Sequence, residues 1–243
     1  MSYKGSEVYD QEAFFQHYTA RRERQESPNE RIESPVFKEL LGDVTGQAIL
    51  DLGCGHGSFG NELLQQGCQS YHGVDGSKNM VNAANVNLEG TNSTIYHSSL
   101  ESWDFPEESY DTVISRLVFH YIDDVQSIFN HVHATLKDEG RFVFSVQHPV
   151  LTSSIESAAR SPKKSNWIVD EYFETGKRVE PWIEEEVVKY HRTVENYFRL
   201  LKKAGFSIED IRECAPQREQ FDSEEEYKRR KRIPLFLVFS CRK

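Results

Sequence analysis

Cysteine is scarce in this 243-residue chain, and no segment of it is both long and apolar. The cysteines include no pair at Cys-x-x-Cys spacing, which argues against a zinc site and against a disulfide framework. The clearest apolar run towards the carboxyl end, residues 235–239, is much shorter than the ~20 residues that cross a bilayer. The first residues also lack the basic and apolar regions of a signal peptide. These absences predict a soluble, cytoplasmic protein with no membrane partner and no bound metal.

Positive charge is in short supply as well. Lys and Arg number 29 against 39 Asp and Glu, which gives a formal net charge of −10. This balance opposes nonspecific binding to nucleic-acid phosphates or to anionic lipid. The one basic run, residues 228–232, follows the acidic residues 224–226, and acids before bases suit the dipole of a single solvated helix.

The order of short apolar runs and longer amphipathic runs indicates the fold class. Strands are expected at 48–52, 71–74, 94–97, 110–115, 141–147, 206–213 and 235–241, and helices at 57–66, 77–87, 124–137 and 192–204. Strands that alternate with helices pair in parallel through right-handed crossovers, with helices on both faces of the sheet. The sequence therefore predicts an α/β protein with a doubly wound, mostly parallel, seven-stranded sheet.

The alternation fails from Pro149 to about residue 186. Long irregular insertions in compact domains are usually functional or disordered. Trp167, Tyr172 and Phe173 favour a lid over disorder, because large aromatic surfaces are costly to leave in water. We therefore expect four segments: a helical cap at 1–45, a ligand-binding core at 46–148, a lid at 149–190 and the rest of the core sheet at 191–243.

Four glycines fall within the eight residues 53–60, directly after the first expected strand. Glycine lets a backbone turn sharply and approach a ligand, and the next helix presents its free amides to the same space. Gly55, Gly57 and Gly60 also spell the dinucleotide pattern G-x-G-x-x-G, so the glycines alone leave two cofactor types open. The two types are a dinucleotide and S-adenosylmethionine. Asp51 favours S-adenosylmethionine, because a carboxylate repels the pyrophosphate of a dinucleotide but attracts the α-amino group of S-adenosylmethionine.

Asp75 ends the second expected strand, where its carboxylate can accept hydrogen bonds from both hydroxyls of an adenosyl ribose. The chain resembles the class I S-adenosylmethionine-dependent methyltransferases of small-molecule type. The resemblance is carried by D-L-G-C-G-x-G (51–57), G-V-D-G-S (73–77) and S-Y-D-T-V-I-S (109–115), and it spans roughly residues 46–147. It implies the doubly wound fold and S-adenosyl-L-methionine as the cofactor.

The resemblance also implies roles for individual residues. The methionyl end of the cofactor is expected at Asp51, Gly53, Cys54 and Gly55, and the ribose at Asp75. At the end of the third strand, the Ser99 hydroxyl and the Leu100 amide are candidates for contacts with the adenine. Gly76 stands where many relatives carry an aliphatic residue over the adenine face, and Met80, one turn later, is expected to cover that face instead.

The amino-terminal stretch 9–24 resembles the helix that closes over the cofactor in many small-molecule members. Tyr18 is a candidate contact for the methionyl end, and Arg22 is a candidate partner for the methionyl carboxylate. The alternative is an amphipathic helix that only packs against the core.

Methyl transfer is an in-line displacement that depends mainly on positioning and on exclusion of water. An alcohol or phenol acceptor benefits from a base, and His120, Tyr121 and His148 follow the fourth and fifth strands as candidates, with packing as the alternative for each. His191 is a further candidate for substrate contact. Its alternative is that Thr193 caps a helix while His191 packs under the lid.

The residues after the fourth strand bear on the methyl acceptor. Enzymes that methylate the amino groups of nucleic-acid bases usually show Asn, Asp or Ser followed by Pro-Pro and an aromatic residue there, whereas this chain has Ser115, Arg116, Leu117 and Val118. The sequence therefore favours a small-molecule O- or N-methyltransferase. The alternatives are an RNA or protein methyltransferase, and a noncatalytic subunit that binds S-adenosylmethionine.

Overall fold

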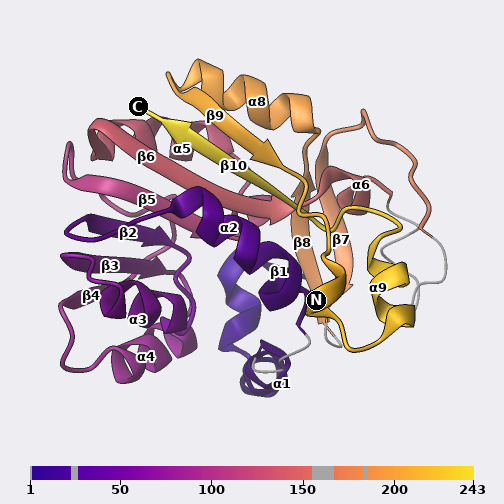
Figure 1. Cartoon of the computed structure of the whole chain (residues 1–243), viewed down its shortest axis with the longest axis horizontal. Helices are drawn as coiled ribbons and strands as arrows, with labels where there is room; N and C mark the ends of the chain where they lie inside the picture. The colour runs from indigo at the N-terminus through magenta and orange to yellow at the C-terminus, as the bar shows by residue number, and fades with distance from the viewer. Residues whose placement is uncertain (1, 23–26, 155–166, 183–184) are drawn as a thin grey trace.

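The computed structural model describes residues 2–22, 27–154, 167–182 and 185–243, and their strands form two sheets (Figure 1). The larger sheet has seven strands in the order β4-β3-β2-β5-β6-β10-β9. Its strands are β2 (Ala48–Leu52), β3 (Ser70–Asp75), β4 (Ser93–His97), β5 (Tyr110–Arg116), β6 (Leu136–Gln147), β9 (Ser207–Arg212) and β10 (Phe236–Arg242). The five strands from β4 to β6 pair in parallel, whereas β10 is antiparallel to both of its neighbours. The predicted α/β class and the mostly parallel sheet are confirmed.

Helices cover both faces of the large sheet, and alternate residues of each strand point to opposite faces. Leu50 packs with α5 (Val125–Thr135) and α8 (Val194–Lys203) on one face. Its neighbour Ile49 packs with α2 (Ser34–Leu41) and α3 (Ser58–Gln65) on the other. Both strand residues are completely buried, as expected for parallel strands between two helical layers. The helix α4 (Lys78–Asn87) joins β3 to β4 and is capped by Ser77, whose hydroxyl accepts from the Met80 amide.

The smaller sheet was not predicted. It has the order β1-β8-β7 and is built from β1 (Ser2–Lys4), β7 (Gly176–Trp182) and β8 (Glu185–His191). It lies beyond the carboxyl ends of the parallel strands of the large sheet (Figure 1). The segment 149–190, which we expected to be irregular, therefore contributes a hairpin, preceded by the short helix α6 (Pro149–Thr152). Residues 155–166 of the expected lid lie outside the described ranges.

Two residues explain why the hairpin was not predicted from alternation of apolar and polar residues. Pro181 lies in β7, an edge strand of the small sheet, and edge strands are where proline is tolerated in sheets. Lys189 lies in the central strand β8 and is only 1% exposed, because its ammonium group donates to a Glu180 oxygen at 2.7 Å. In the sequence, a lysine predicts an exposed position, so its burial in a central strand cannot be inferred from the local pattern.

The amino-terminal segment 2–10 crosses from the small sheet to the large one, and we call it the strap. It consists of β1 and a 3-10 helix, η1 (Gly5–Asp10), and the helix α1 (Glu12–Arg22) follows. The strap begins beside β8 and ends at α4, where the Asp10 carboxylate accepts from the Ser77 hydroxyl at 2.7 Å and from the Asn79 amide at 3.2 Å. It therefore links the small sheet to the start of α4, beside the large sheet.

The sequences at the ends of α8 and α9 explain where these helices begin and how their charges are arranged. Thr193 caps α8 by accepting from the Asn196 amide, and Asn196 returns a hydrogen bond to the Thr193 amide. The acidic and basic run forms α9 (Glu224–Arg230), with its acids in the first turn and its bases in the last. The short helices η2 (Asn29–Glu33), η3 (Phe119–Tyr121) and η4 (Arg218–Gln220) connect longer elements. None of the helices in the described ranges is both long and apolar enough to span a bilayer.

Candidate active site

A cavity of about 640 Å³ opens at the carboxyl ends of β2, β3 and β5, under the strap. This is the edge at which ligands bind in open α/β sheets. Most residues singled out from the sequence line it: Tyr18, Asp51, Gly53, Cys54, Gly55, Asp75, Gly76, Met80, Ser99, Leu100 and Tyr121. The Arg22 side chain lies outside the part of the chain that the structure describes.

The glycine loop after β2 needs glycine for two different reasons. Gly53 and Gly55 have φ angles of 79° and 56°, which side chains other than glycine rarely adopt. A Cβ atom on Gly53 would also lie 2.3 Å from the Val118 side chain, whereas a Cβ on Gly55 would meet nothing within 4 Å. Gly55 therefore exposes its backbone to the open cavity, where a ligand can approach it.

Asp51 is the last charged residue of β2, and it is only 3% exposed. One carboxylate oxygen accepts a 2.7 Å hydrogen bond from the Tyr71 hydroxyl, and the other has no hydrogen-bond partner within the described ranges. Gly60 makes room for this tyrosine, since a Cβ there would lie 2.4 Å from the ring. Burial raises the pKa of Asp51 from 3.8 to about 7. A buried, half-satisfied carboxylate at a cavity wall is suited to a cationic partner.

Asp75 joins the end of β3 to the glycine loop. Its carboxylate accepts from the Gly55 amide and from the Ser77 amide, both at 2.9 Å. Burial raises the pKa of Asp75, and these two amide hydrogen bonds oppose the shift. Each carboxylate oxygen has two acceptor positions, so Asp75 can still accept hydrogen bonds from hydroxyls in the cavity.

Gly76 has a steric explanation that the sequence did not reveal. A Cβ atom there would lie 2.3 Å from the Ser6 hydroxyl oxygen of the strap. The strap thus occupies space that a larger residue at 76 would fill. Met80, which is 3% exposed, also lines the cavity on this side.

The three candidate histidines do not line the cavity. His120 is buried, its Nδ1 has no hydrogen-bond partner in the described ranges, and burial lowers its pKa well below 6.5. His148 Nε2 lies 3.0 Å from a Glu213 oxygen, and its Nδ1 accepts from the Val150 amide at the start of α6. His191 contacts the Thr152 hydroxyl and the Tyr172 carbonyl, so it packs within the expected lid.

Tyrosines form much of the cavity wall on the side of β5 and the small sheet. Tyr9 from the strap, Tyr18, Tyr121 and Tyr190 all line it, and sequence reasoning missed Tyr9 and Tyr190. The rings of Tyr9 and Tyr18 meet edge to face, with centroids 4.8 Å apart. Burial raises the pKa of Tyr121, so its phenol stays protonated at neutral pH. Among the described residues of segment 149–190, Tyr190 is the one that lines the cavity.

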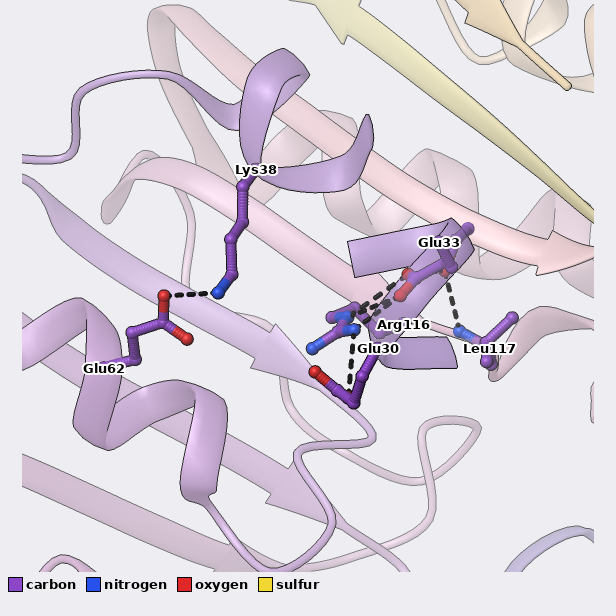
Figure 2. A network of polar contacts seen from close by, with 7 residues as sticks. Glu30, Glu33, Lys38, Glu62, Arg116 and Leu117 are labelled. Carbon is purple, nitrogen blue, oxygen red and sulfur yellow. Dashed lines mark hydrogen bonds and ion pairs between the residues drawn. The ribbon is translucent and has the colours of Figure 1, made fainter. Parts of the chain in front are cut away.

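Arg116, at the end of β5, is a further cavity residue that the sequence analysis did not single out. Its guanidinium is held by Glu33, which is completely buried (Figure 2). Nε lies 3.2 Å from both Glu33 oxygens, and Nη2 also donates to one of them. The sequence around Arg116 does not reveal this role, because its partner Glu33 lies 83 residues earlier in the chain.

Comparison with known proteins places this geometry in a family. Residues 20–211, most of the chain, match the family described as methyltransferase domain. The chain belongs to that family. A crystal structure of an S-adenosylmethionine-dependent methyltransferase from Mesorhizobium loti has 33% sequence identity and a TM-score of 0.80, and the match covers 87% of this chain and 97% of that one.

Two other relatives agree. A putative S-adenosylmethionine-dependent methyltransferase from Listeria monocytogenes has 32% identity and a TM-score of 0.79, covering 87% of this methyltransferase and 96% of its own chain. An uncharacterized protein of Haemophilus influenzae is 32% identical over 216 residues, which are 85% of each chain. This methyltransferase therefore uses S-adenosylmethionine as its cofactor, as the sequence resemblance implied.

The residues around the cavity fit that cofactor. The unpartnered oxygen of Asp51 suits an α-amino group, the Asp75 carboxylate suits ribose hydroxyls, and the open backbone at Gly55 allows close approach. No cluster of three or more His, Cys, Asp or Glu side chains suited to a metal occurs in the described part of this methyltransferase.

Proposed function

We propose that this methyltransferase transfers the methyl group to an oxygen or nitrogen atom of a small molecule. The observation that carries the proposal is the roof of the cavity: strap residues 4–7 and Tyr9 line it from one side and Tyr190 lines it from the small sheet. Carboxylates also stand in its wall at Glu7, Glu101 and Asp123, and all three are exposed. A covered, acidic cavity of about 640 Å³ is in the size range of small-molecule sites and repels nucleic-acid phosphates.

The strand order supports an orientation for the cofactor. Asp51, Gly53, Cys54 and Gly55 follow β2 and hold the methionyl end in this proposal. Asp75 on the neighbouring β3 holds the ribose, and Ser99 and Leu100, after β4, hold the adenine beside Met80 and Gly76. Because β4, β3 and β2 are consecutive neighbours in the sheet, the three parts of the cofactor fall in their chemical order.

The same order assigns the acceptor to the β5 side, next to the methionyl end. Tyr121 follows β5 and is the one of the three catalytic candidates that lines the cavity. When bound, S-adenosylmethionine would supply a methyl carbon on a positively charged sulfur for in-line attack by an acceptor lone pair, and the carbon–sulfur bond would break to release S-adenosylhomocysteine. Tyr121 and the neighbouring Tyr9, Tyr18 and Tyr190 then exclude water and orient the acceptor. Because its pKa is raised, Tyr121 acts here as a hydrogen-bonding group rather than as a base.

A labelled-methyl assay tests the proposal. Wild-type protein and S-adenosylmethionine carrying a labelled methyl group are incubated with fractionated metabolites, with RNA and protein pools run in parallel. We expect label in a metabolite fraction. Label confined to RNA or protein would overturn the small-molecule proposal, and cofactor binding without transfer to any pool would favour a noncatalytic binding subunit.

Asp75→Ala tests the orientation of the cofactor. Loss of two charge-assisted hydrogen bonds to the ribose is expected to weaken binding of S-adenosylhomocysteine at least tenfold by calorimetry. Affinity close to that of wild type would contradict the ribose assignment. Asp111→Ala is the matched control, because Asp111 pairs with Lys137 and does not line the cavity.

A further inference from the structure

The Arg116 guanidinium is a buried cation in the wall of the cavity. Its side chain is 9% exposed, and the guanidinium carbon lies 4.6 Å from the centroid of the Phe59 ring and 5.5 Å from that of Phe37. These aromatic contacts and the pairing with Glu33 hold the group in one place. Ser145 supports Glu33 in turn by donating its hydroxyl to a Glu33 oxygen at 2.6 Å.

The Nε and Nη2 edge of the guanidinium binds Glu33, whereas the Nη1 side does not take part in this pairing. Nε and Nη2 donate to Glu33, and Nη2 also lies 3.8 Å from a Glu30 oxygen (Figure 2). Nη1 makes no hydrogen bond to any residue in the described ranges. Since an arginine carries five N–H donors in a fixed planar fork, Nη1 remains available to a second acceptor in the cavity.

Asp51 lies beside Arg116 at the same edge of the sheet. Asp51 pairs in register with Ile114, two residues before Arg116, and the Arg116 charge lowers the pKa of Asp51 against the effect of burial. Among the residues that the structure describes, the wall therefore offers an Asp51 oxygen with no hydrogen-bond partner and, on the neighbouring strand, an Arg116 Nη1 with none. An α-amino acid carries an ammonium and a carboxylate on the same carbon, and this is the complementary arrangement.

We propose that Arg116 binds the carboxylate of the methionyl tail through Nη1 while Asp51 binds the amino group of the same tail. The proposal rests on the proposed assignment of Asp51 to the methionyl end. It makes Arg116, rather than Arg22, the cation that anchors the carboxylate of the cofactor. Glu33 then acts as a positioning residue, because it holds the guanidinium through Nε and Nη2 and leaves Nη1 unengaged.

A pair of ligands that differ only in the carboxylate tests this directly. Calorimetry compares S-adenosylhomocysteine with its decarboxylated analogue, S-adenosyl-3-thiopropylamine, on wild type and on Arg116→Met. A charge-assisted hydrogen bond implies that wild type binds the carboxylated ligand about 10- to 100-fold more tightly through this contact. In Arg116→Met that preference is expected to disappear, while the affinity for the decarboxylated ligand stays within about twofold of wild type.

A purely structural arginine would give a different result, since losing it would weaken both ligands equally and keep their ratio. Arg116→Met leaves Glu33 buried without its partner, so Arg116→Met/Glu33→Gln is measured beside it to remove that uncompensated charge. Glu33→Gln alone keeps Arg116 and is expected to retain the preference. Arg212→Met is a surface control, because Arg212 pairs with Glu39 and does not line the cavity.

The outcomes separate this inference from the proposed function. If wild type binds neither ligand, the proposed cofactor orientation fails. If wild type binds both and the preference survives in both Arg116 variants, only the role of Arg116 is overturned. Loss of the preference in Arg22→Met instead would restore the amino-terminal helix as the source of the anchor and would also overturn the inference.

Discussion

Asp51→Asn is expected to stabilise this methyltransferase in the absence of cofactor while removing most of its affinity for the cofactor. The pKa of Asp51 is raised from 3.8 to about 7 in the folded protein, chiefly by burial. Between these two values the folded state keeps a proton that the unfolded chain releases. The free energy of unfolding therefore falls as the pH rises from about 4 to about 7, and the loss is complete above pH 7.

The magnitude follows from the size of the shift. At about 1.4 kcal/mol per pKa unit, a difference of about three units destabilises the folded protein by about 4 kcal/mol at pH 8, and by only about 0.5 kcal/mol near pH 4. Asparagine carries no charge, and its oxygen can still accept the 2.7 Å hydrogen bond from the Tyr71 hydroxyl. We therefore expect a gain of up to about 4 kcal/mol for Asp51→Asn at pH 8 and little change near pH 4.

Urea unfolding of wild type and Asp51→Asn at several pH values measures this difference. Asp111→Asn is a control of opposite sign, since pairing with Lys137 and the Ala48 amide lowers the pKa of Asp111 and its charge is favourable. A difference between Asp51→Asn and wild type that does not change with pH would refute the reasoning. A variant less stable than wild type at pH 8 would do the same.

Calorimetry with S-adenosylhomocysteine completes the test. In wild type, the affinity is expected to fall up to about tenfold for each pH unit below 7, because the ligand's ammonium group must displace the proton on Asp51. In Asp51→Asn this pH dependence should vanish together with most of the affinity. Retention of tight, pH-dependent binding by the variant would show that another group meets the ammonium.

Two further variants test how the strap and α8 are held. Gly76→Ala places a Cβ atom 2.3 Å from the Ser6 oxygen, so it is expected to displace the strap and weaken S-adenosylhomocysteine binding; Gly76→Ala/Ser6→Gly should recover much of the loss, and equal affinity in all three proteins would contradict the close packing. Thr193→Ala removes the cap of α8 and should lower the free energy of unfolding by about 1 kcal/mol in urea, whereas Thr193→Ser should not.

The part of the site that was predictable from sequence depends on short-range order. Asp51 is the next-to-last residue of β2 and Asp75 is the last residue of β3, and neighbouring parallel strands bring their carboxyl ends to one edge of the sheet. The glycine loop between β2 and α3 is likewise a local signal, because positive φ angles at Gly53 and Gly55 favour glycine whatever the rest of the chain does. Local pattern and sheet topology together were enough to place these residues around one cavity.

The part that was missed depends on contacts between distant segments. The strap enters the site because residues 2–4 pair with residues 186–188, a parallel pairing that no local pattern indicates. Arg116 is held by Glu33 from η2, and neither residue shows by its sequence context that it is buried. A charged residue in the core becomes stable only through its partner, so its burial is a property of the pair.

The histidines show why position at a strand end is not sufficient. His148 follows β6, and β6 is two strands away from β2 in the sheet order. Neighbouring strands lie about 4.8 Å apart, so the end of β6 lies about 10 Å from the end of β2. His148 is therefore farther from the cavity than residues that follow β3 and β5, the direct neighbours of β2. The strand order along the sheet reverses between the parallel neighbours β2 and β5, and the cavity lies at this switch point, where successive crossovers run to opposite sides of the sheet. His120 follows the correct strand, but it lies in η3 and points into the protein, so the adjacent Tyr121 takes the place in the wall. Two factors therefore decide which polar residues line the cavity: the order of the strands in the sheet, and the direction in which each side chain of η3 points.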